Sequence, residues 1–266
     1  MKMAQRTRNQ NFGKARVNPW DYTISFITCF DRVMKHHHNA YKVTISIDKP
    51  VDFEIDGKSH GAVRGYIMNQ NVQHTCAAKG ATVLVNFIET HSFLGWQIKS
   101  LLNDRPFMNI SELLDDDAIG KVLPANYNEL SEHILVPHVN AFLHSLFAGS
   151  EFIQTSPLDE RIGKVLKYIH TNLHQQMALS DAAAMIDLSP GRLRHLFAEQ
   201  MGIPFSQYVL WKKIRNTLTT CILDGVNLTE SCHLYGFSDQ PHFNKVFKRV
   251  FGMNPMMLIN HARILL

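Results

Sequence analysis

Apolar and polar residues alternate in short runs between about residues 26 and 89, which is the pattern of β-strands. Residues 41–47, YKVTISI, and residues 51–57, VDFEIDG, alternate and are rich in β-branched side chains, while residues 81–89, ATVLVNFIE, form a longer apolar run. Asp56 and Gly57 are a hairpin-type turn pair next to such runs. Short strands at this close spacing favour an antiparallel barrel or sandwich.

The pattern becomes helical from about Ser111 and is clearest over residues 126–147. Apolar side chains recur there at helical spacing, and Pro137 is expected to kink or break the helix. The polar face of this segment carries Glu129 and Glu132 rather than lysines, which favours dimerisation or core packing over a membrane-surface role. The following segment, AGSEFIQTSPLDE, is typical of a linker.

The last hundred residues repeat one helical scheme twice. Residues 179–202 and residues 228–252 each predict a short helix, a turn and a longer helix, with Ser189 and Ser238 as the expected N-caps of the two longer helices. Residues 204–225 between them predict one long linking helix. Two helix-turn-helix units in the same chain are a much more specific signal than one.

The second of these longer helices has two contrasting faces. In GFSDQPHFNKVFKRVFG, residues 236–252, the apolar residues follow the spacing of a helix with one buried face. The remaining positions carry amides, a histidine and basic residues, which are side chains that hydrogen-bond base edges or neutralise phosphates. A solvated polar face is the alternative interpretation of the same pattern.

The charge is divided unequally along the chain. Residues 1–155 carry 15 Lys and Arg against 15 Asp and Glu, and residues 156–266 carry 12 against 8, which accounts for the whole net charge of +4. This division favours a polyanionic partner for the second half. The four scattered cysteines, the lack of a signal-peptide pattern and the lack of a run long enough to span a membrane predict a cytoplasmic protein.

The C-terminal half resembles the DNA-binding domain of the AraC/XylS family of bacterial transcription regulators. The family signature is matched by Gly236, Phe237, Asp239, Phe243 and the residues that follow to Pro255, and the first unit matches through LSPGRLRHLF and GIPFSQYV. The resemblance implies an α+β multidomain fold. We expect a cupin-like sensor or dimerisation domain with flanking helices at residues 1–150, a linker at 151–158 and an all-α double helix-turn-helix domain at 159–266.

Side chains near the start of a helix in the major groove reach base edges, so we assign base reading to the outer faces of the two longer helices. The predicted base-reading residues are Gly191, Arg192, Arg194, His195, Gln240, His242, Asn244 and Lys245. The predicted phosphate contacts are Lys212, Lys213, Arg215, Lys248 and Arg249. Among them Arg194 is the first choice for direct readout, because an arginine fork suits guanine.

Residues 36–75 loosely resemble the cupin-like barrel of such sensors. Four of the five histidines in this stretch, His36, His37, His38 and His74, could supply imidazoles to a metal site. However, Lys42 and Val43 occupy the place of the glutamate of metal-binding cupins, and successive strand residues face opposite sides, so at most two of the first three can converge. We therefore predict no metal or other cofactor, with His36, His38 and His74 lining an organic-ligand pocket or facing solvent.

Three functions compete at this stage. The favoured one is a ligand-responsive, sequence-specific transcription regulator, an activator that binds double-stranded DNA, a small-molecule effector and RNA polymerase. It would act as a monomer or a homodimer and without a membrane partner. The second is a cupin-type metal-dependent enzyme with a helical oligomerisation module, which the missing carboxylate and the absence of catalytic motifs disfavour. The third is a DNA binder that needs no ligand.

Overall fold

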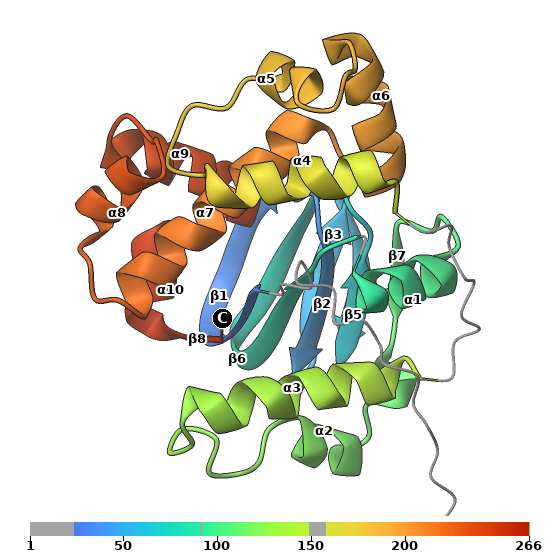
Figure 1. Ribbon diagram of the computed structural model, residues 1–266. Coiled ribbons are helices and arrows are strands. Elements are labelled where there is room, and N and C mark those ends of the chain that lie inside the picture. Colours follow the sequence, from blue (N-terminus) through green and yellow to red (C-terminus); the bar gives the residue numbers. More distant parts are fainter. Residues whose placement is uncertain (1–23, 91, 149–157, 266) are drawn as a thin grey trace, which may run out of the picture.

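The computed structural model describes residues 24–90, 92–148 and 158–265, and its N-terminal half is built on an antiparallel sheet (Figure 1). Its strands are β1 (Ile24–His36), β2 (Tyr41–Ser46), β3 (Val51–Ile55), β4 (Lys58–Val63), β5 (Gly65–Met68), β6 (His74–Ile88), β7 (Phe107–Asn109) and β8 (Ala262–Leu265). The predicted strands therefore correspond to β2, β3 and the second half of β6. Asp56 and Gly57 both have positive φ and close the β3–β4 hairpin, as expected.

The long strand β6 organises this sheet. One edge of β6 pairs with β1, and β2 and β3 share its other edge, so the order along the main path is β4-β3-β6-β2-β5-β7. The alternation read from the sequence places one set of strand side chains on each face, and both faces are covered. The sheet is barrel-like, in agreement with the predicted cupin-like architecture.

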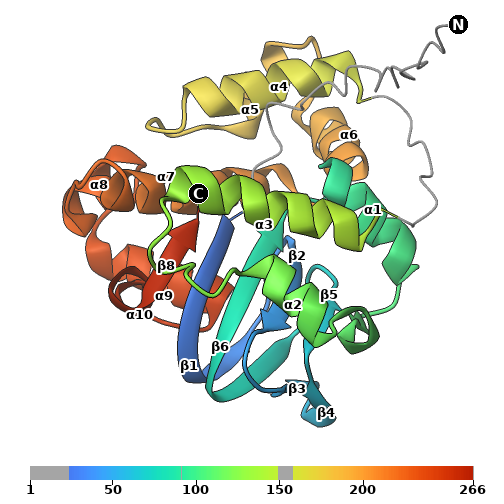
Figure 2. The same ribbon diagram turned by 90° about the horizontal axis from the view of Figure 1, so that it is seen from below.

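One face of the sheet packs against the three helices that follow it in the sequence. These are α1 (Phe93–Leu102), α2 (Asp116–Val122) and α3 (Glu132–Leu146), with the short 3-10 helix η1 (Ser111–Leu113) before α2. Leu135, Val139 and Leu143 of α3 are buried in the same core as Val43 and Ile67 of the sheet. Pro137 lies inside α3 without breaking it, so this segment is a core-packing helix (Figures 1 and 2).

The C-terminal half is helical as predicted. It contains α4 (Glu160–Thr171), α5 (Leu179–Ala184), α6 (Pro190–Met201), α7 (Phe205–Ile222), α8 (Leu228–Leu234), α9 (Gln240–Phe251) and α10 (Pro255–His261). The pairs α5–α6 and α8–α9 are the two helix-turn-helix units, and α7 is the long helix that joins them (Figure 1). The expected linker lies outside the described residues except for Leu158, so the division of the chain at residues 151–158 stays a prediction.

The two halves share a core that the sequence did not predict. Trp211 of α7 and Phe251 of α9 belong to the same buried cluster as Phe26, Phe53 and Phe87 of the sheet. The ring of Phe87 meets Trp211 edge-on at 5.8 Å and Phe251 at 5.0 Å between centroids. The final strand β8 also crosses over and pairs with β1, so the last residues of the chain lie in the N-terminal sheet (Figure 2).

Candidate nucleic-acid interface

Helix α6 presents the predicted reading residues of the first unit to solvent. Its N-cap Ser189 accepts a hydrogen bond from the backbone N–H of Arg192, and Pro190 occupies the first turn, where a missing N–H costs nothing. Leu193 and Phe197 are completely buried and fix the rotation of the helix. The same rotation leaves Gly191, Arg192, Arg194 and His195 exposed.

Helix α9 repeats this arrangement in the second unit. Phe243, Val246, Phe247 and Phe251 form its buried face. The predicted cap was wrong by one residue: the Asp239 carboxylate, not Ser238, accepts from the N–H of His242 at 2.6 Å. Ser238 instead lies 3.1 Å from Nδ1 of the His242 ring.

The predicted base-reading residues of α9 differ in how exposed they are to solvent. His242 and Lys245 are exposed, whereas Gln240 and Asn244 are half-buried. The Thr229 hydroxyl of α8 donates to Oε1 of Gln240 at 2.8 Å, which leaves the amide N–H groups of Gln240 for another acceptor. Oδ1 of Asn244 is buried and has no hydrogen-bond partner among the residues that the structure describes.

Lys212 does not lie where a phosphate contact requires it. Its side chain is buried, and Nζ donates to Oε1 of Glu89 at 2.5 Å in a buried ion pair between α7 and the end of β6. In this structure the predicted phosphate role of Lys212 is therefore wrong. The helical periodicity of α7 carried no signal for this, because the partner comes from the other half of the chain, 123 residues earlier.

The other predicted phosphate contacts remain accessible to different degrees. Lys248 and Arg249 are exposed in the last turn of α9. Lys213 and Arg215 are half-buried on α7, and Lys213 donates to the backbone carbonyl of Gln175 at 3.3 Å. Burial also lowers the pKa of Lys213. Lys248 and Arg249 are thus the stronger candidates for contacts with DNA phosphates.

The structure brings His36, His38 and His74 together inside the N-terminal half. His36 is the last residue of β1 and pairs with His74, the first residue of β6, while His38 lies two residues further on the same side. The ring centroids are 4.4 to 5.5 Å apart and all three side chains are buried, so the alternative that they face solvent is wrong. His37 points the opposite way and is exposed, as strand alternation predicts.

Lys42 of β2 reaches the same cluster, and its importance was missed. Nζ lies 3.1 Å from Nε2 of His74 and 5.7 Å from the ring centre of Tyr66. Complete burial of the side chain lowers the pKa of Lys42 to about 8. The alternating pattern YKVTISI places Lys42 on the opposite face from Tyr41 and Val43, so the strand pattern did hold a signal for an inward-facing lysine.

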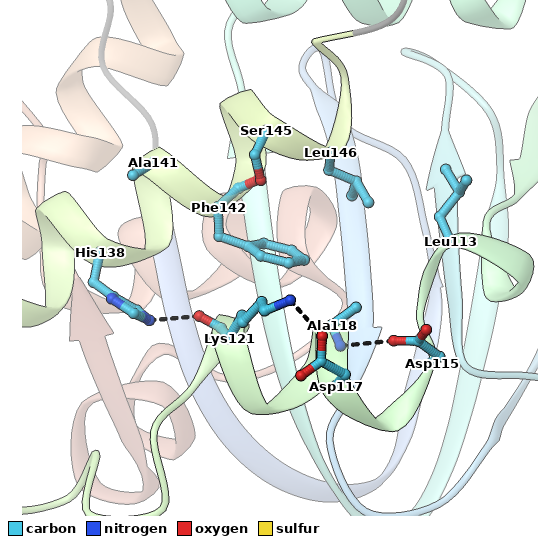
Figure 3. A pocket seen from close by; sticks show the side chains of 10 residues that line it. All are labelled: Leu113, Asp115, Asp117, Ala118, Lys121, His138, Ala141, Phe142, Ser145 and Leu146. Carbon is cyan, nitrogen blue, oxygen red and sulfur yellow. Dashed lines mark hydrogen bonds and ion pairs between the residues drawn. The ribbon is translucent and has the colours of Figure 1, made fainter.

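A surface depression lies on the other face of the sheet, between α2 and α3 (Figure 3). It encloses about 590 Å³ and is open to solvent. Its polar wall consists of the Lys121–Asp117 ion pair and of His138, whose Nε2 lies 2.5 Å from the carbonyl of Lys121. None of the sequence-predicted site residues lines this depression.

Comparisons with known proteins agree with this architecture. The family described as "Helix-turn-helix domain" matches residues 182–260. The probable transcriptional regulator LumQ of Photobacterium leiognathi is 25% identical over 250 residues, which cover 88% of this chain and 95% of LumQ. The arabinose operon regulatory protein of Escherichia coli K12 is 26% identical over 172 residues, covering 62% of this chain and 58% of that protein.

A solved structure extends the likeness to the fold of both halves. ToxT from Vibrio cholerae O395 superimposes with a TM-score of 0.57 and 14% identity, over 90% of this chain and 96% of that chain. The matched helix-turn-helix domain and the curated relatives indicate a DNA-binding transcription regulator. Residues 182–260 match a helix-turn-helix domain, and the chain is similar over most of its length to a probable transcriptional regulator. No helix in the described part is long and apolar enough to cross a membrane.

Proposed function

We propose that α6 and α9 read base edges in the major groove of double-stranded DNA, and that a small organic ligand held by the N-terminal half controls this binding. The observation that carries the DNA-reading part is the matched exposure of the two helices. Each buries its fourth, eighth and twelfth residues and leaves basic or histidine side chains of its first two turns exposed. N-terminal positions of such a helix are the ones that reach base edges.

The individual roles follow from side-chain chemistry. Arg192, Arg194 and His195 of α6, and His242, Asn244 and Lys245 of α9, are proposed to contact bases together with Gln240, and Gly191 gives the duplex room to approach. An arginine fork suits guanine O6 and N7, and an amide suits adenine N6 and N7. Lys248, Arg249, Lys213 and Arg215 are proposed to contact phosphates. Lys212 is left out because it is buried against Glu89.

The experiment that tests this reading is selection of binding sites from random double-stranded DNA. Arg194→Ala is expected to relax sequence preference at one or two positions and to cost about 1–3 kcal/mol on the best site. Arg32→Ala, which removes an exposed arginine of β1, is the matched control and should select the same sites as the unchanged protein. Unchanged base preference in Arg194→Ala would contradict the assignment.

The proposal of a ligand draws on the solved relatives and on the shared core. One ToxT structure holds an unsaturated fatty acid and another holds (E)-4-(8-methylnaphthalen-1-yl)but-3-enoic acid, both of them carboxylic acids. In this chain, Phe87 contacts Trp211 and Phe251, so a change in the sheet reaches α7 and α9 directly. A ligand-induced change in that packing is how we propose that occupancy alters DNA binding.

A thermal-shift experiment on the full chain tests the ligand class. An unsaturated fatty acid is expected to raise the melting temperature, because a ligand that binds only the folded state stabilises it. A flat response to carboxylic acids would remove this ligand class and would favour a ligand-independent DNA binder, without touching the roles of α6 and α9.

The remaining partners follow from the class of protein. We propose that the chain acts in the cytoplasm as an activator that contacts RNA polymerase, that it has no catalytic activity, and that it forms homodimers on repeated sites. Footprints of the purified protein on genomic DNA would show single or paired sites, and paired sites at fixed spacing would support the dimer.

A further inference from the structure

We propose that His36, His38 and His74 form a binding site for a divalent transition metal ion, with Zn²⁺ as the best match. One ring nitrogen from each of the three lies within 4.8 Å of those from the other two. The proposal revises the prediction, made from the strand pattern alone, that these side chains serve an organic ligand and no metal.

The orientation of each imidazole is fixed by a backbone carbonyl. Nδ1 of His36 lies 2.7 Å from the carbonyl of Met34, Nδ1 of His38 lies 3.1 Å from that of Ala40, and Nδ1 of His74 lies 2.9 Å from that of Val72. A carbonyl can only accept, so the proton of each neutral ring is on Nδ1. The lone pair on each Nε2 is therefore available to a metal. Protein ligands to zinc show this same outer hydrogen bond.

All three imidazole rings are buried, so each ring nitrogen that does not face a backbone carbonyl needs a partner inside the protein. Nε2 of His38 is buried and has no hydrogen-bond partner among the described residues. An unpaired buried acceptor is costly, and a cation between the rings would remove that cost.

Lys42 is the alternative occupant of this position. Its ammonium group donates to Nε2 of His74 at 3.1 Å, which satisfies one imidazole and leaves Nε2 of His38 without a partner. The two cations would repel each other, so metal binding requires the Lys42 side chain to turn away from His74. The structure thus shows a cluster of three acceptors that a single ammonium group only partly satisfies.

The donor set selects the class of metal. Three imidazoles without a carboxylate suit Zn²⁺ and its neighbours in the transition series, and disfavour Ca²⁺ and Mg²⁺, which require oxygen ligands. Tetrahedral zinc with bonds of about 2.0–2.1 Å separates its ligand nitrogens by about 3.3 Å. The nitrogens now lie within 4.8 Å of one another, so the rings would have to move closer together on binding.

The three histidines also lie next to the C-terminal end of α9. A Cβ atom on Gly252, the residue that ends α9, would lie 2.6 Å from Nδ1 of His36, and the N–H of Met34 donates to the carbonyl of Gly252 at 3.3 Å. Any displacement of His36 on metal binding is therefore passed to α9. This consequence rests on the proposed function, whereas the metal site itself does not.

The first test is a metal-binding measurement on the untagged full chain, stripped with a chelator, equilibrated with Zn²⁺ and freed of excess ion. One tightly held Zn²⁺ per chain is expected for the unchanged protein and for His37→Ala, the matched control on the same strand. His38→Gln is expected to bind at least about tenfold more weakly, the smallest loss seen when even an outer partner of a zinc ligand is changed. Substoichiometric zinc in the unchanged protein, or equal binding by His38→Gln, would overturn the site.

Two further readouts keep the test decisive if His38→Gln fails to fold. Co²⁺ in place of Zn²⁺ is expected to give the visible absorption of a tetrahedral nitrogen site, and its absence would count against the proposal. Lys42→Met is expected to bind Zn²⁺ more tightly, because a competing ammonium group is gone. Binding by Lys42→Met but not by the unchanged protein would identify Lys42 as the resident cation and overturn the proposal.

The coupling to α9 is tested on DNA. Zn²⁺ is expected to change the affinity of the unchanged protein for its selected site and to leave that of His38→Gln unchanged. Equal affinity with and without Zn²⁺ would contradict the coupling. Failure of the protein to bind any selected DNA in either state would instead contradict the proposed function.

Discussion

Helices α6 and α9 are built alike but pack against different parts of the molecule. Both α6 and α9 have twelve residues, a side-chain N-cap and a left-handed glycine, Gly202 or Gly252, at the C-terminal end. Phe197 and Phe247 occupy the same, eighth position and are both fully buried. The two helices therefore share the same pattern of caps, buried positions and terminal glycines.

The hydrophobic cores against which the two helices pack are different. The core of the first unit is closed by α4 and the start of α7, with Ile162, Val165 and Tyr208 around Phe197. The core around Phe247 continues through Phe251 into the sheet, where it meets Phe87. The ends of the helices show the same contrast: Gly202 has room for a Cβ atom, and Gly252 is pressed against β1.

This difference means that the second unit cannot move without disturbing the sheet. The first unit touches the N-terminal half through a few polar contacts, such as the Thr90 hydroxyl donating to the carbonyl of Met201. A helical pattern of buried positions therefore fixes which face of a helix is covered, but not which part of the molecule covers it.

The largest expected effect comes from shortening the matched phenylalanines. Phe247→Ala should lower the free energy of unfolding by about 3–5 kcal/mol, the usual cost of removing a buried phenylalanine ring. Because its core is shared, hydrogen exchange should rise in α8 and α9 and also in β1. Phe197→Ala should cost a similar amount but should raise exchange only in α4, α5, α6 and the start of α7. Equal loss of protection in β1 for both variants would mean that the two cores are not separate.

A second, smaller effect is expected at the buried ion pair between the halves. Glu89→Gln should destabilise the protein by about 3 kcal/mol, because it leaves the buried ammonium group of Lys212 without its counter-charge. Adding Lys212→Met to the same chain should recover most of that loss in a denaturant titration. If the two substitutions simply add, the pair contributes nothing to joining the halves.

A third effect is expected on the reactivity of Cys232, which belongs to the shared core. Burial, with a smaller contribution from Cys221 and Asp239, raises the pKa of the Cys232 thiol to about 12. The thiolate is the nucleophile, so alkylation of Cys232 at pH 8 should be at least about tenfold slower than that of the exposed Cys29.

Because the first unit has no cysteine, Cys232 reports on the second unit alone. Phe247→Ala should bring the two alkylation rates closer together, and Phe197→Ala should leave their ratio unchanged. Equal rates for Cys29 and Cys232 in the unchanged protein would show that the shared core opens readily.

The smallest effect is expected from a single phosphate contact. Lys248→Ala should weaken binding about equally on all DNA sequences and should reduce the salt dependence of the binding constant by about one unit, since one fewer counterion is released. Lys35→Ala, which removes an exposed lysine of β1, is the control and should leave the slope unchanged. An unaltered slope in Lys248→Ala would remove it from the interface.

The elements that local patterns control were predicted well. The period of apolar residues placed α6, α7 and α9, because that signal lies within one helix. Alternation likewise separated His37 from His36 and His38. The cap of α9 was misplaced by one residue, since Ser238 and Asp239 are both good capping residues and only the geometry of the turn chooses between them.

Features that depend on distant parts of the chain were missed. Nothing near Lys212 in the sequence indicates a partner at Glu89, so an ordinary basic helix position was taken for a phosphate contact. The convergence of His74 with His36 was one of two alternatives that the sequence left open, because it depends on the register of β1 against β6, which includes an irregularity between Val33 and His36. Such a register is set by the whole sheet and cannot be read from either strand alone.

Strand β8 has a consequence for how the two halves can part. The chain leaves the sheet after α3, builds both helix-turn-helix units and then returns to pair with β1 through Ala262–Leu265. The helical half is therefore attached to the N-terminal half at both of its ends. Moving this half away from the sheet would have to break the shared core, and a variant that loses β8 would keep only one of the two attachments.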